Sequence, residues 1–123
     1  MLDGGRRMVV IVDDDEAVRE SLQFLLETAG FLVATFASGR ECLQALRAED
    51  AGCLVVDQHM PELTGLEFLA ELRRRGVRLP ALLITGSPSP DLELRAATLD
   101  GMKVMGKPPV EDELLRFVER SMQ

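Results

Sequence analysis

Five short hydrophobic runs occur along the chain, separated by longer segments in which polar residues are frequent. The runs are Met8 to Val12, Phe31 to Phe36, Cys53 to Val56, Ala81 to Ile84 and Met102 to Met105. Short runs rich in aliphatic, β-branched or aromatic residues are typical of strands. A continuous apolar run such as the first indicates a strand that is buried on both faces. The pattern therefore predicts five strands.

Between these runs, apolar residues recur every three or four positions, which is the spacing of one helix face. Ser38 with Glu41, and Thr64 with Glu67, have the spacing of a capping box at a helix start. The predicted helices run from Val18 to Ala29 with Gly30 as C-cap, from Ser38 to about Ala48, from Thr64 to Gly76, from Ser89 to Gly101, and from Glu111 to Met122.

Predicted strands and helices alternate along the chain with short connections. Such alternation predicts an α/β fold in which helices cover both faces of a parallel sheet. Right-handed crossovers leave few topologies for it. In sheets of this kind, ligands bind beyond the carboxyl ends of the strands, near the switch in strand order. The polar residues that end or follow the strands are therefore the first candidates for a functional site.

Composition fits one globular domain. The chain has 123 residues, of which 46% are hydrophobic and 28% are charged, and this is enough for a single core. We assign residues 8–122 to the domain and residues 1–7 to a flexible leader without the features of a signal peptide. No apolar run approaches the roughly 20 residues that span a bilayer, so no membrane contact is expected.

Charge and rare residues exclude several function classes. A net charge of −7 and a pI of about 4.7 repel phosphate backbones, so direct nucleic-acid binding is not expected. Cys42 and Cys53 lack the spacing of metal ligands, and we expect buried free thiols in a reducing cytosol, which predicts a cytoplasmic protein. His59 is the one histidine, which excludes a histidine-rich metal site.

Acidic residues follow the first strand and end the third. One acid of the run Asp13, Asp14 and Asp15 is enough to cap the next helix, and Asp15 is the best placed. Three adjacent carboxylates repel one another and raise their own pKa values unless a cation neutralises them. We therefore favour metal binding over capping alone. Mg²⁺ is the best candidate, because it accepts one or two carboxylates and fills its other positions with water and phosphate oxygens.

Asp57, Thr85 and Lys107 end or follow three different predicted strands. Alone, Lys107 is typical of a solvated lysine and Thr85 of a strand-end hydroxyl. A buried carboxylate such as Asp57 is costly to desolvate, so it needs either a structural partner or a chemical role. As a nucleophile it would accept a phosphoryl group and form an aspartyl phosphate. That transfer needs mainly positioning and charge neutralisation, which Mg²⁺, the ammonium and the hydroxyl together supply.

Four segments carry a family resemblance, and they are Val9 to Asp15, Val55 to Gly65, Leu83 to Gly86 and Gly106 to Pro108. With these segments the chain resembles the receiver domains of two-component response regulators over essentially its whole length. Within the family it is most similar to receivers of the nitrogen-fixation regulator type. The resemblance implies a flavodoxin-like fold with strand order 2-1-3-4-5. It also implies a signalling phosphoacceptor, which catalyses only its own phosphorylation and dephosphorylation, rather than an enzyme.

The resemblance also implies roles for the acidic residues. Asp57 would be the phosphoacceptor. Asp14 and Asp57 would ligate Mg²⁺ directly, together with the backbone carbonyl of His59. Asp13 would act on the metal through a bound water.

Roles for the other site residues follow from the same resemblance. Lys107 would pair with the acids and then with the phosphoryl oxygen, and Thr85 would move to hydrogen-bond that phosphoryl group. The peptide bond between Lys107 and Pro108 is expected to be cis. The side chains of His59 and Ser87 would border the site and influence attack by water on the acyl phosphate.

One position departs from the family pattern. The third residue before the lysine is usually Tyr or Phe, whose ring turns inward on activation, but here it is Val104. The fourth predicted helix is also unusual, because its start contains Pro88 and Pro90. Together with the fifth strand and the last helix it would form the usual output surface of the family, so an atypical output partner is expected.

Partners are implied by the resemblance as well. The phosphoryl donor would be a histidine kinase or a phosphotransfer protein, and the target a downstream protein partner or output domain. Homodimer formation on phosphorylation is compatible with the resemblance. Because the chain ends just after the last predicted helix, we expect a receiver without an output domain, either a native stand-alone regulator or part of a longer protein.

The same residues leave three alternatives to a phosphorylation switch to consider. A phosphorylation-independent scaffold stays open, with Val104 as its hint. A phosphohydrolase of the haloacid-dehalogenase kind is a distant alternative, because it needs an Asp at the position of His59 and a cap domain. A dinucleotide-binding domain is rejected, because it needs glycines where Asp13 to Asp15 would repel a pyrophosphate.

Overall fold

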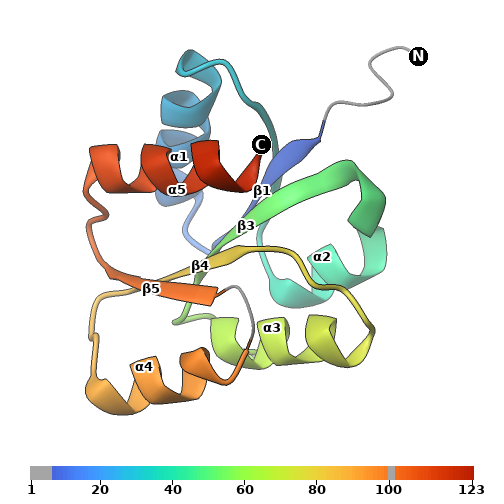
Figure 1. Cartoon of the computed structure of the whole chain (residues 1–123), viewed down its shortest axis with the longest axis vertical. Helices are drawn as coiled ribbons and strands as arrows, with labels where there is room; N and C mark the ends of the chain where they lie inside the picture. The colour runs from blue at the N-terminus through green and yellow to red at the C-terminus, as the bar shows by residue number, and fades with distance from the viewer. Residues whose placement is uncertain (1–6, 100–101) are drawn as a thin grey trace.

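The computed structural model describes residues 7–99 and 102–123, in which helices cover both faces of one sheet (Figure 1). The strands are β1 (Met8–Val12), β2 (Leu32–Phe36), β3 (Ala51–Asp57), β4 (Ala81–Thr85) and β5 (Met102–Gly106). The helices are α1 (Glu16–Thr28), α2 (Gly39–Ala45), the 3-10 helix η2 (Ala48–Asp50), α3 (Gly65–Arg74), α4 (Pro90–Ala97) and α5 (Glu111–Ser121).

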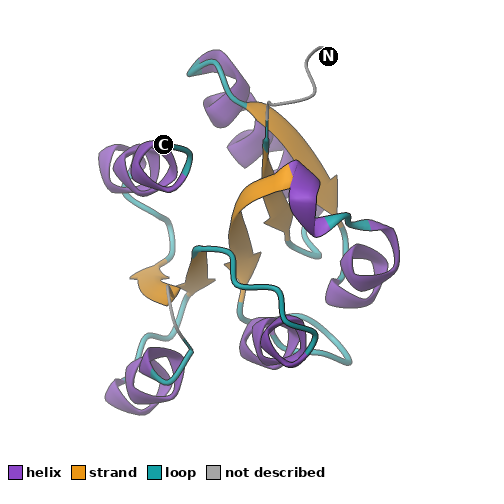
Figure 2. Ribbon diagram, turned by 45° about the vertical axis from the view of Figure 1, so that its right-hand side comes forward, coloured by secondary structure: helices purple, strands orange, loops and turns teal. Residues whose placement is uncertain are grey.

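All strands of the sheet are parallel, and their order is β2-β1-β3-β4-β5. The predicted fold class and strand order are therefore confirmed. Figure 2 shows the strand arrows pointing the same way, so the carboxyl ends lie along one edge. The register pairs Val12 with Val56, Asp57 with Ile84, and Thr85 with Gly106. Residues that end β1, β3, β4 and β5 are thereby aligned side by side.

Two hydrophobic cores lie on the two faces of the sheet. Residues of α1 and α5 pack on one face, and residues of α2, α3 and α4 pack on the other. Because successive side chains of a strand point to opposite faces, β3 supplies Cys53 and Val55 to one core and Leu54 and Val56 to the other. This double burial explains the continuous apolar character of the central strands.

Local signals place most helix ends where they were predicted. The Thr64 hydroxyl accepts a hydrogen bond from the Glu67 N–H, and the Glu67 carboxylate accepts one from the Thr64 N–H, which completes a capping box. Gly30 and Gly76 follow α1 and α3 with φ of 100° and 83°. Only glycine adopts this left-handed conformation readily, so both helices end there.

The second helix differs from its prediction. It ends at Ala45 rather than at about Ala48, and Leu46 leaves the helix with an extended backbone to pack against one core. The third strand begins at Ala51 rather than at Cys53. Glu41 accepts a hydrogen bond from the Ala37 N–H rather than from Ser38, so this capping box is only half formed.

Two predictions concern residues that the structure does not describe. The first six residues of the predicted leader, 1–6, and Gly101 lie outside the described residues. The fourth helix was predicted to end at Gly101, but α4 ends earlier, at Ala97. Within the described part of the chain, no helix has the length and apolar character that crossing a membrane requires.

Candidate functional site

The acidic residues singled out in the sequence meet at the carboxyl ends of β1 and β3. Carboxylate oxygens of Asp13, Asp14 and Asp57 all lie within 4.8 Å of one another. Asp13 and Asp57 are buried, with 3% and 4% of their surface exposed, whereas Asp14 is exposed. Two buried carboxylates, each of which costs free energy to desolvate, therefore share one cluster, and this cluster reaches solvent through Asp14.

Lys107 brings a positive charge to this cluster from the loop after β5. Its Nζ lies 2.9 Å from Oδ1 of Asp57 and 3.8 Å from Oδ2 of Asp13. Burial alone would favour the neutral amine, but the close contact with Asp57 and the neighbouring carboxylates raise the pKa of Lys107 above its usual value. The side chain is thus an ammonium held against Asp57.

The cluster still carries more negative than positive charge, because three carboxylates face this one ammonium. Burial raises the pKa of Asp13 above its usual value, and the charge of Asp57 adds to the rise. Oδ1 of Asp57 is buried, and the Lys107 ammonium 2.9 Å away is its ion-pair partner. Clustered oxygen ligands with excess negative charge together fit a hard divalent cation. This acidic triad is typical of the Mg²⁺ site of receivers.

The loop between β1 and α1 fixes the first acids. Asp15 caps α1 as predicted, since its carboxylate accepts hydrogen bonds from N–H groups of the first turn. Oδ1 of Asp13 accepts from the Asp15 N–H at 2.9 Å, and the Arg19 guanidinium donates to the Asp13 carbonyl at 2.7 Å. Helix capping by Asp15 therefore coexists with the clustering of Asp13 and Asp14 near Asp57. The role of Arg19 was missed, because its target is a backbone carbonyl that no sequence pattern reveals.

The loop between β3 and α3 is packed tightly against Asp57. The Gly65 N–H donates to the Gln58 carbonyl at 3.1 Å, and the Gln58 side chain accepts from the Leu66 N–H at 2.9 Å. A Cβ on Gly65 would collide with the carbonyl oxygen of Asp57 and with Leu83. Gly65 belongs to the segment that carries the family resemblance, yet its spatial role was not predicted.

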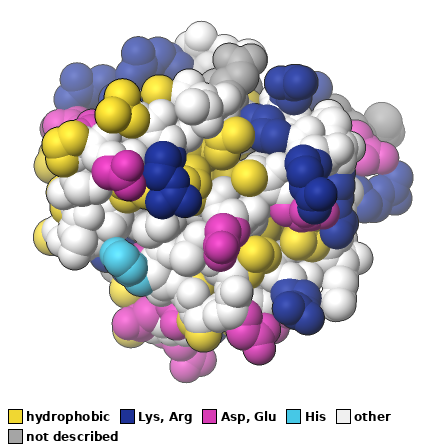
Figure 3. Space-filling view, turned by 90° about the horizontal axis from the view of Figure 1, so that it is seen from below, with side chains coloured by type: hydrophobic (Ala, Val, Ile, Leu, Met, Phe, Trp, Pro, Cys, Tyr) yellow, Lys and Arg dark blue, Asp and Glu magenta, His cyan; other side chains and the backbone are white. Residues whose placement is uncertain are grey.

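Thr85 ends β4 beside the acidic cluster, and its side chain is fully buried. Its Oγ1 lies 3.1 Å from Nε2 of His59 and accepts a hydrogen bond from the Ser87 N–H at 3.0 Å. Its carbonyl accepts from the Lys107 N–H at 2.8 Å, which fixes the end of β5 next to β4. The peptide bond between Lys107 and Pro108 is cis, as expected. The residue His59 is exposed, and Figure 3 shows the histidine side chain in cyan at the surface.

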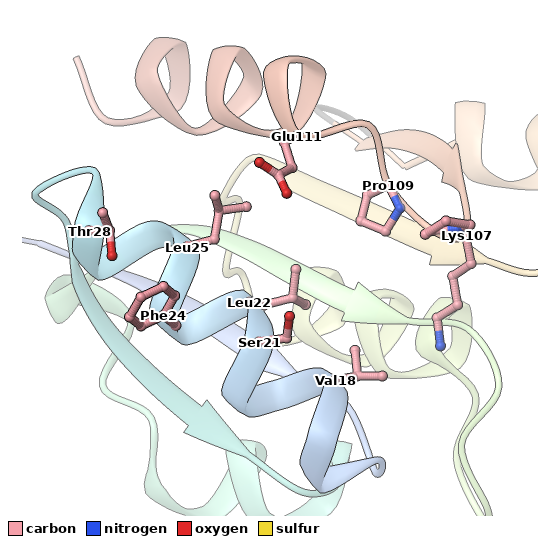
Figure 4. A pocket seen from close by; sticks show the side chains of 10 residues that line it. Val18, Ser21, Leu22, Phe24, Leu25, Thr28, Lys107, Pro109 and Glu111 are labelled. Carbon is pink, nitrogen blue, oxygen red and sulfur yellow. The ribbon is translucent and has the colours of Figure 1, made fainter.

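A cavity of about 590 Å³ opens between α1 and the start of α5. Figure 4 shows Lys107 at one end of this cavity and Phe24 of α1 toward the other, with Leu22, Leu25 and Pro109 between them. Phe24 is 73% exposed, which is unusual for a large apolar side chain. The sequence did not predict this cavity, because it depends on how α1 and α5 are spaced.

A parallel sheet of this order, with carboxylates and a lysine at its carboxyl edge, defines the architecture of a receiver. Residues 9–119 match the family model described as the response regulator receiver domain. The chain therefore belongs to the response regulator receiver family. Its class is that of signalling phosphoacceptors rather than true enzymes.

Individual relatives agree with this assignment. The transcriptional regulatory protein FixJ of Azorhizobium caulinodans is 38% identical over 114 residues, which cover 93% of this chain and 54% of that protein. FixJ of Bradyrhizobium diazoefficiens is 35% identical, with 94% and 56% covered. The predicted similarity to nitrogen-fixation regulators is thus confirmed. The chain spans about half the length of these curated relatives.

Solved structures show the same fold. The response regulator StyR superposes with a TM-score of 0.89 at 36% sequence identity, covering 96% of this chain and 60% of that one. The structure of FixJ-N superposes with a TM-score of 0.80 at 29% identity, covering 94% and 93% of the two chains.

Proposed function

We propose that Asp57 accepts a phosphoryl group from a histidine kinase or phosphotransfer protein in a Mg²⁺-dependent reaction, and that phosphorylation switches the domain to control a partner or output domain. The observation that carries this proposal is the environment of Asp57. Its carboxylate is buried at the end of a central strand, 2.9 Å from the Lys107 ammonium and next to two further acids.

In this reaction a carboxylate oxygen of Asp57 forms a bond to phosphorus while the bond from phosphorus to the donor histidine breaks. Lys107 orients the carboxylate and then pairs with a phosphoryl oxygen. Asp14, Asp57 and the His59 carbonyl would hold Mg²⁺, with Asp13 acting through a bound water, and the metal would supply charge neutralisation. Burial of Asp57 limits access of water to the acyl phosphate, and this protects the product.

The Thr85 hydroxyl then bonds the new phosphoryl group, which turns a local modification into a change at the end of β4. Moving a two-state equilibrium from 1:99 to 99:1 needs a differential of about 5.5 kcal/mol. Val104 of β5 is half-buried against the core beneath α4, where the family usually has an aromatic ring. The output surface of this receiver therefore operates without the aromatic side chain.

We also propose the extent of the domain, its cellular compartment and its interactions. Residues 8–122 act as one receiver domain, which is supported by a single sheet with two cores. The free buried cysteines fit a reducing cytoplasm. The net charge of −7 argues against direct contact of this chain with nucleic acid. A phosphorylation-dependent homodimer stays a prediction.

Chemical phosphorylation tests the proposal directly. Acetyl phosphate with Mg²⁺ should add one phosphoryl group to the wild type, whereas Asp57→Asn or removal of the metal with EDTA should abolish the labelling. The measurement is intact mass, with circular dichroism to show that the variant is folded. A folded wild type that stays unlabelled would favour the scaffold alternative. Sustained hydrolysis of small phosphate esters would favour a phosphohydrolase.

A further inference from the structure

The hydroxyl of Thr85 is held by two residues outside the acidic cluster. His59 approaches it with Nε2 at 3.1 Å, and the Ser87 N–H donates to it at 3.0 Å. The threonine is fully buried, but the histidine is exposed. The contact between His59 and Thr85 thus joins the loop after Asp57 to the end of the neighbouring strand.

This contact would compete with a phosphoryl group on Asp57 for the same hydroxyl. Asp57 is paired with Ile84 across β3 and β4, so Thr85 ends β4 directly beside the acceptor. A threonine hydroxyl has one proton to donate. When it donates to Nε2 of His59, it has none for a phosphoryl oxygen. When the ring donates instead, the hydroxyl keeps its proton, but its oxygen is held in place by the donors of His59 and Ser87.

We propose that His59 is a positioning residue whose ring holds the Thr85 hydroxyl in the resting state and thereby opposes activation. The inference rests on the proposed function, because it concerns regulation of the same site. Loss of one neutral hydrogen bond of ordinary strength changes an equilibrium roughly fivefold. Release of the ring is easy, since exposed His59 can exchange its bond to Thr85 for bonds to water.

Two substitutions separate the hydrogen bond from the bulk of the ring. His59→Leu keeps an apolar body of similar size but has no polar atom to hold Thr85. His59→Gln carries a side-chain amide that can reach the place of Nε2. Neither removes the backbone carbonyl at this position. The probe is beryllofluoride, a phosphoryl mimic, titrated calorimetrically into the full chain with Mg²⁺ present.

The expected result is a roughly fivefold tighter apparent dissociation constant for His59→Leu, with His59→Gln close to the wild type. In a Thr85→Val background, His59→Leu should change the constant no further, because its partner is already gone. A second measurement uses the metal-free protein. The methyl resonance of Thr85 should shift in His59→Leu and return toward the wild-type position in His59→Gln.

Several results would overturn the inference. They are an unchanged constant for His59→Leu, an equal effect of both substitutions, and a full effect of His59→Leu in the Thr85→Val background. Failure of the proposed function looks different, because a folded wild type would then bind no beryllofluoride and would not be labelled by acetyl phosphate.

Discussion

The position of Asp57 depends on a residue that has no side chain. α3 begins so close to the end of β3 that a Cβ on Gly65 would collide with the Asp57 carbonyl. The obstacle is backbone, which cannot rotate away as a flexible side chain could. The site therefore needs glycine here for space rather than for a special backbone angle.

Gly65→Ala should lower the free energy of unfolding by about 1–3 kcal/mol, the usual cost of forcing a group into a packed site. Urea unfolding monitored by circular dichroism measures this. Gly86→Ala is the matched control, because no heavy atom lies within 4 Å of the added Cβ. Equal losses of stability in the two variants would contradict the proposed collision.

Asp13 carries an electrostatic cost in the metal-free protein. Burial raises the pKa of its carboxyl above the unfolded value of 3.8. The unfolded chain therefore loses this proton at lower pH than the folded chain does. The resulting penalty is absent below the unfolded pKa, and it is complete once the pH has risen above the folded pKa.

Asp13→Asn should consequently raise the melting temperature of the metal-free protein at neutral pH by a few degrees. The amide oxygen can still accept the Asp15 N–H, so the loop keeps its hydrogen bond. Melting curves in EDTA from acidic to neutral pH should show the difference growing as the pH rises, and Mg²⁺ should reduce it. A variant that melts below the wild type at neutral pH would show that the ion pair with Lys107 outweighs the burial cost.

The polar side chains of the site could be predicted from the sequence, but the groups that support them could not. Asp13, Asp57 and Thr85 each follow or end an apolar run, and a parallel sheet brings such positions together. The Arg19 guanidinium donates to the backbone carbonyl of Asp13, and Gly65 leaves room for the backbone carbonyl of Asp57. In both cases the two residues are several positions apart in the chain. Contacts of this kind leave no periodic signal and became visible only in the folded chain.

At the scale of elements, helix ends with a local chemical cause were predictable. The capping box of α3 and the glycines after α1 and α3 need only neighbours in the chain. The boundary between α2 and β3 was not predictable, because it depends on tertiary packing. Gly52, near the start of β3, has a low strand propensity. A Cβ at this position would collide with Met122 at the end of α5, so glycine is needed here for close packing of α5.

We expect the cavity between α1 and α5 to form the docking surface for the phosphodonor. Lys107 both lines this cavity and contacts Asp57, so a protein seated there lies next to the acceptor. The exposed ring of Phe24 offers such a partner the large apolar contact that dominates many interfaces. We expect a histidine kinase or phosphotransfer protein to occupy it.

Phe24→Ala should slow phosphotransfer from the partner kinase roughly tenfold, the effect of losing an interface aromatic. Labelling by acetyl phosphate should be unchanged, because a small donor needs no docking surface. Leu94→Ala on α4 is the control, since this side chain is 71% exposed compared with 73% for Phe24. Rapid-quench assays of both donors measure the rates. Equal slowing with kinase and acetyl phosphate would place the defect in the site rather than in docking.

At the scale of the whole molecule, one sheet ties the two cores together. β3 contributes side chains to both, so neither core can open without disturbing the strand that carries Asp57. Each core holds one cysteine, Cys42 on the side of α2 and α3 and Cys53 on the side of α1 and α5. Both thiols are fully buried, as predicted, and burial raises the pKa of each to about 12.

These thiols report whether the molecule unfolds as a unit. With a pKa of about 12, roughly one thiol in ten thousand is ionised at about pH 8, so native Cys42 and Cys53 should be inert to thiol reagents. Modification should therefore proceed through global unfolding, and both cysteines should react at the same rate because the two cores share β3. Mg²⁺ should slow both reactions equally, since binding to the folded state alone stabilises it. Peptide mass spectrometry after timed labelling resolves the two sites. If Cys42 reacted faster than Cys53, the core beneath α2 and α3 would open separately. The sheet that carries the site would then not unfold as one cooperative unit.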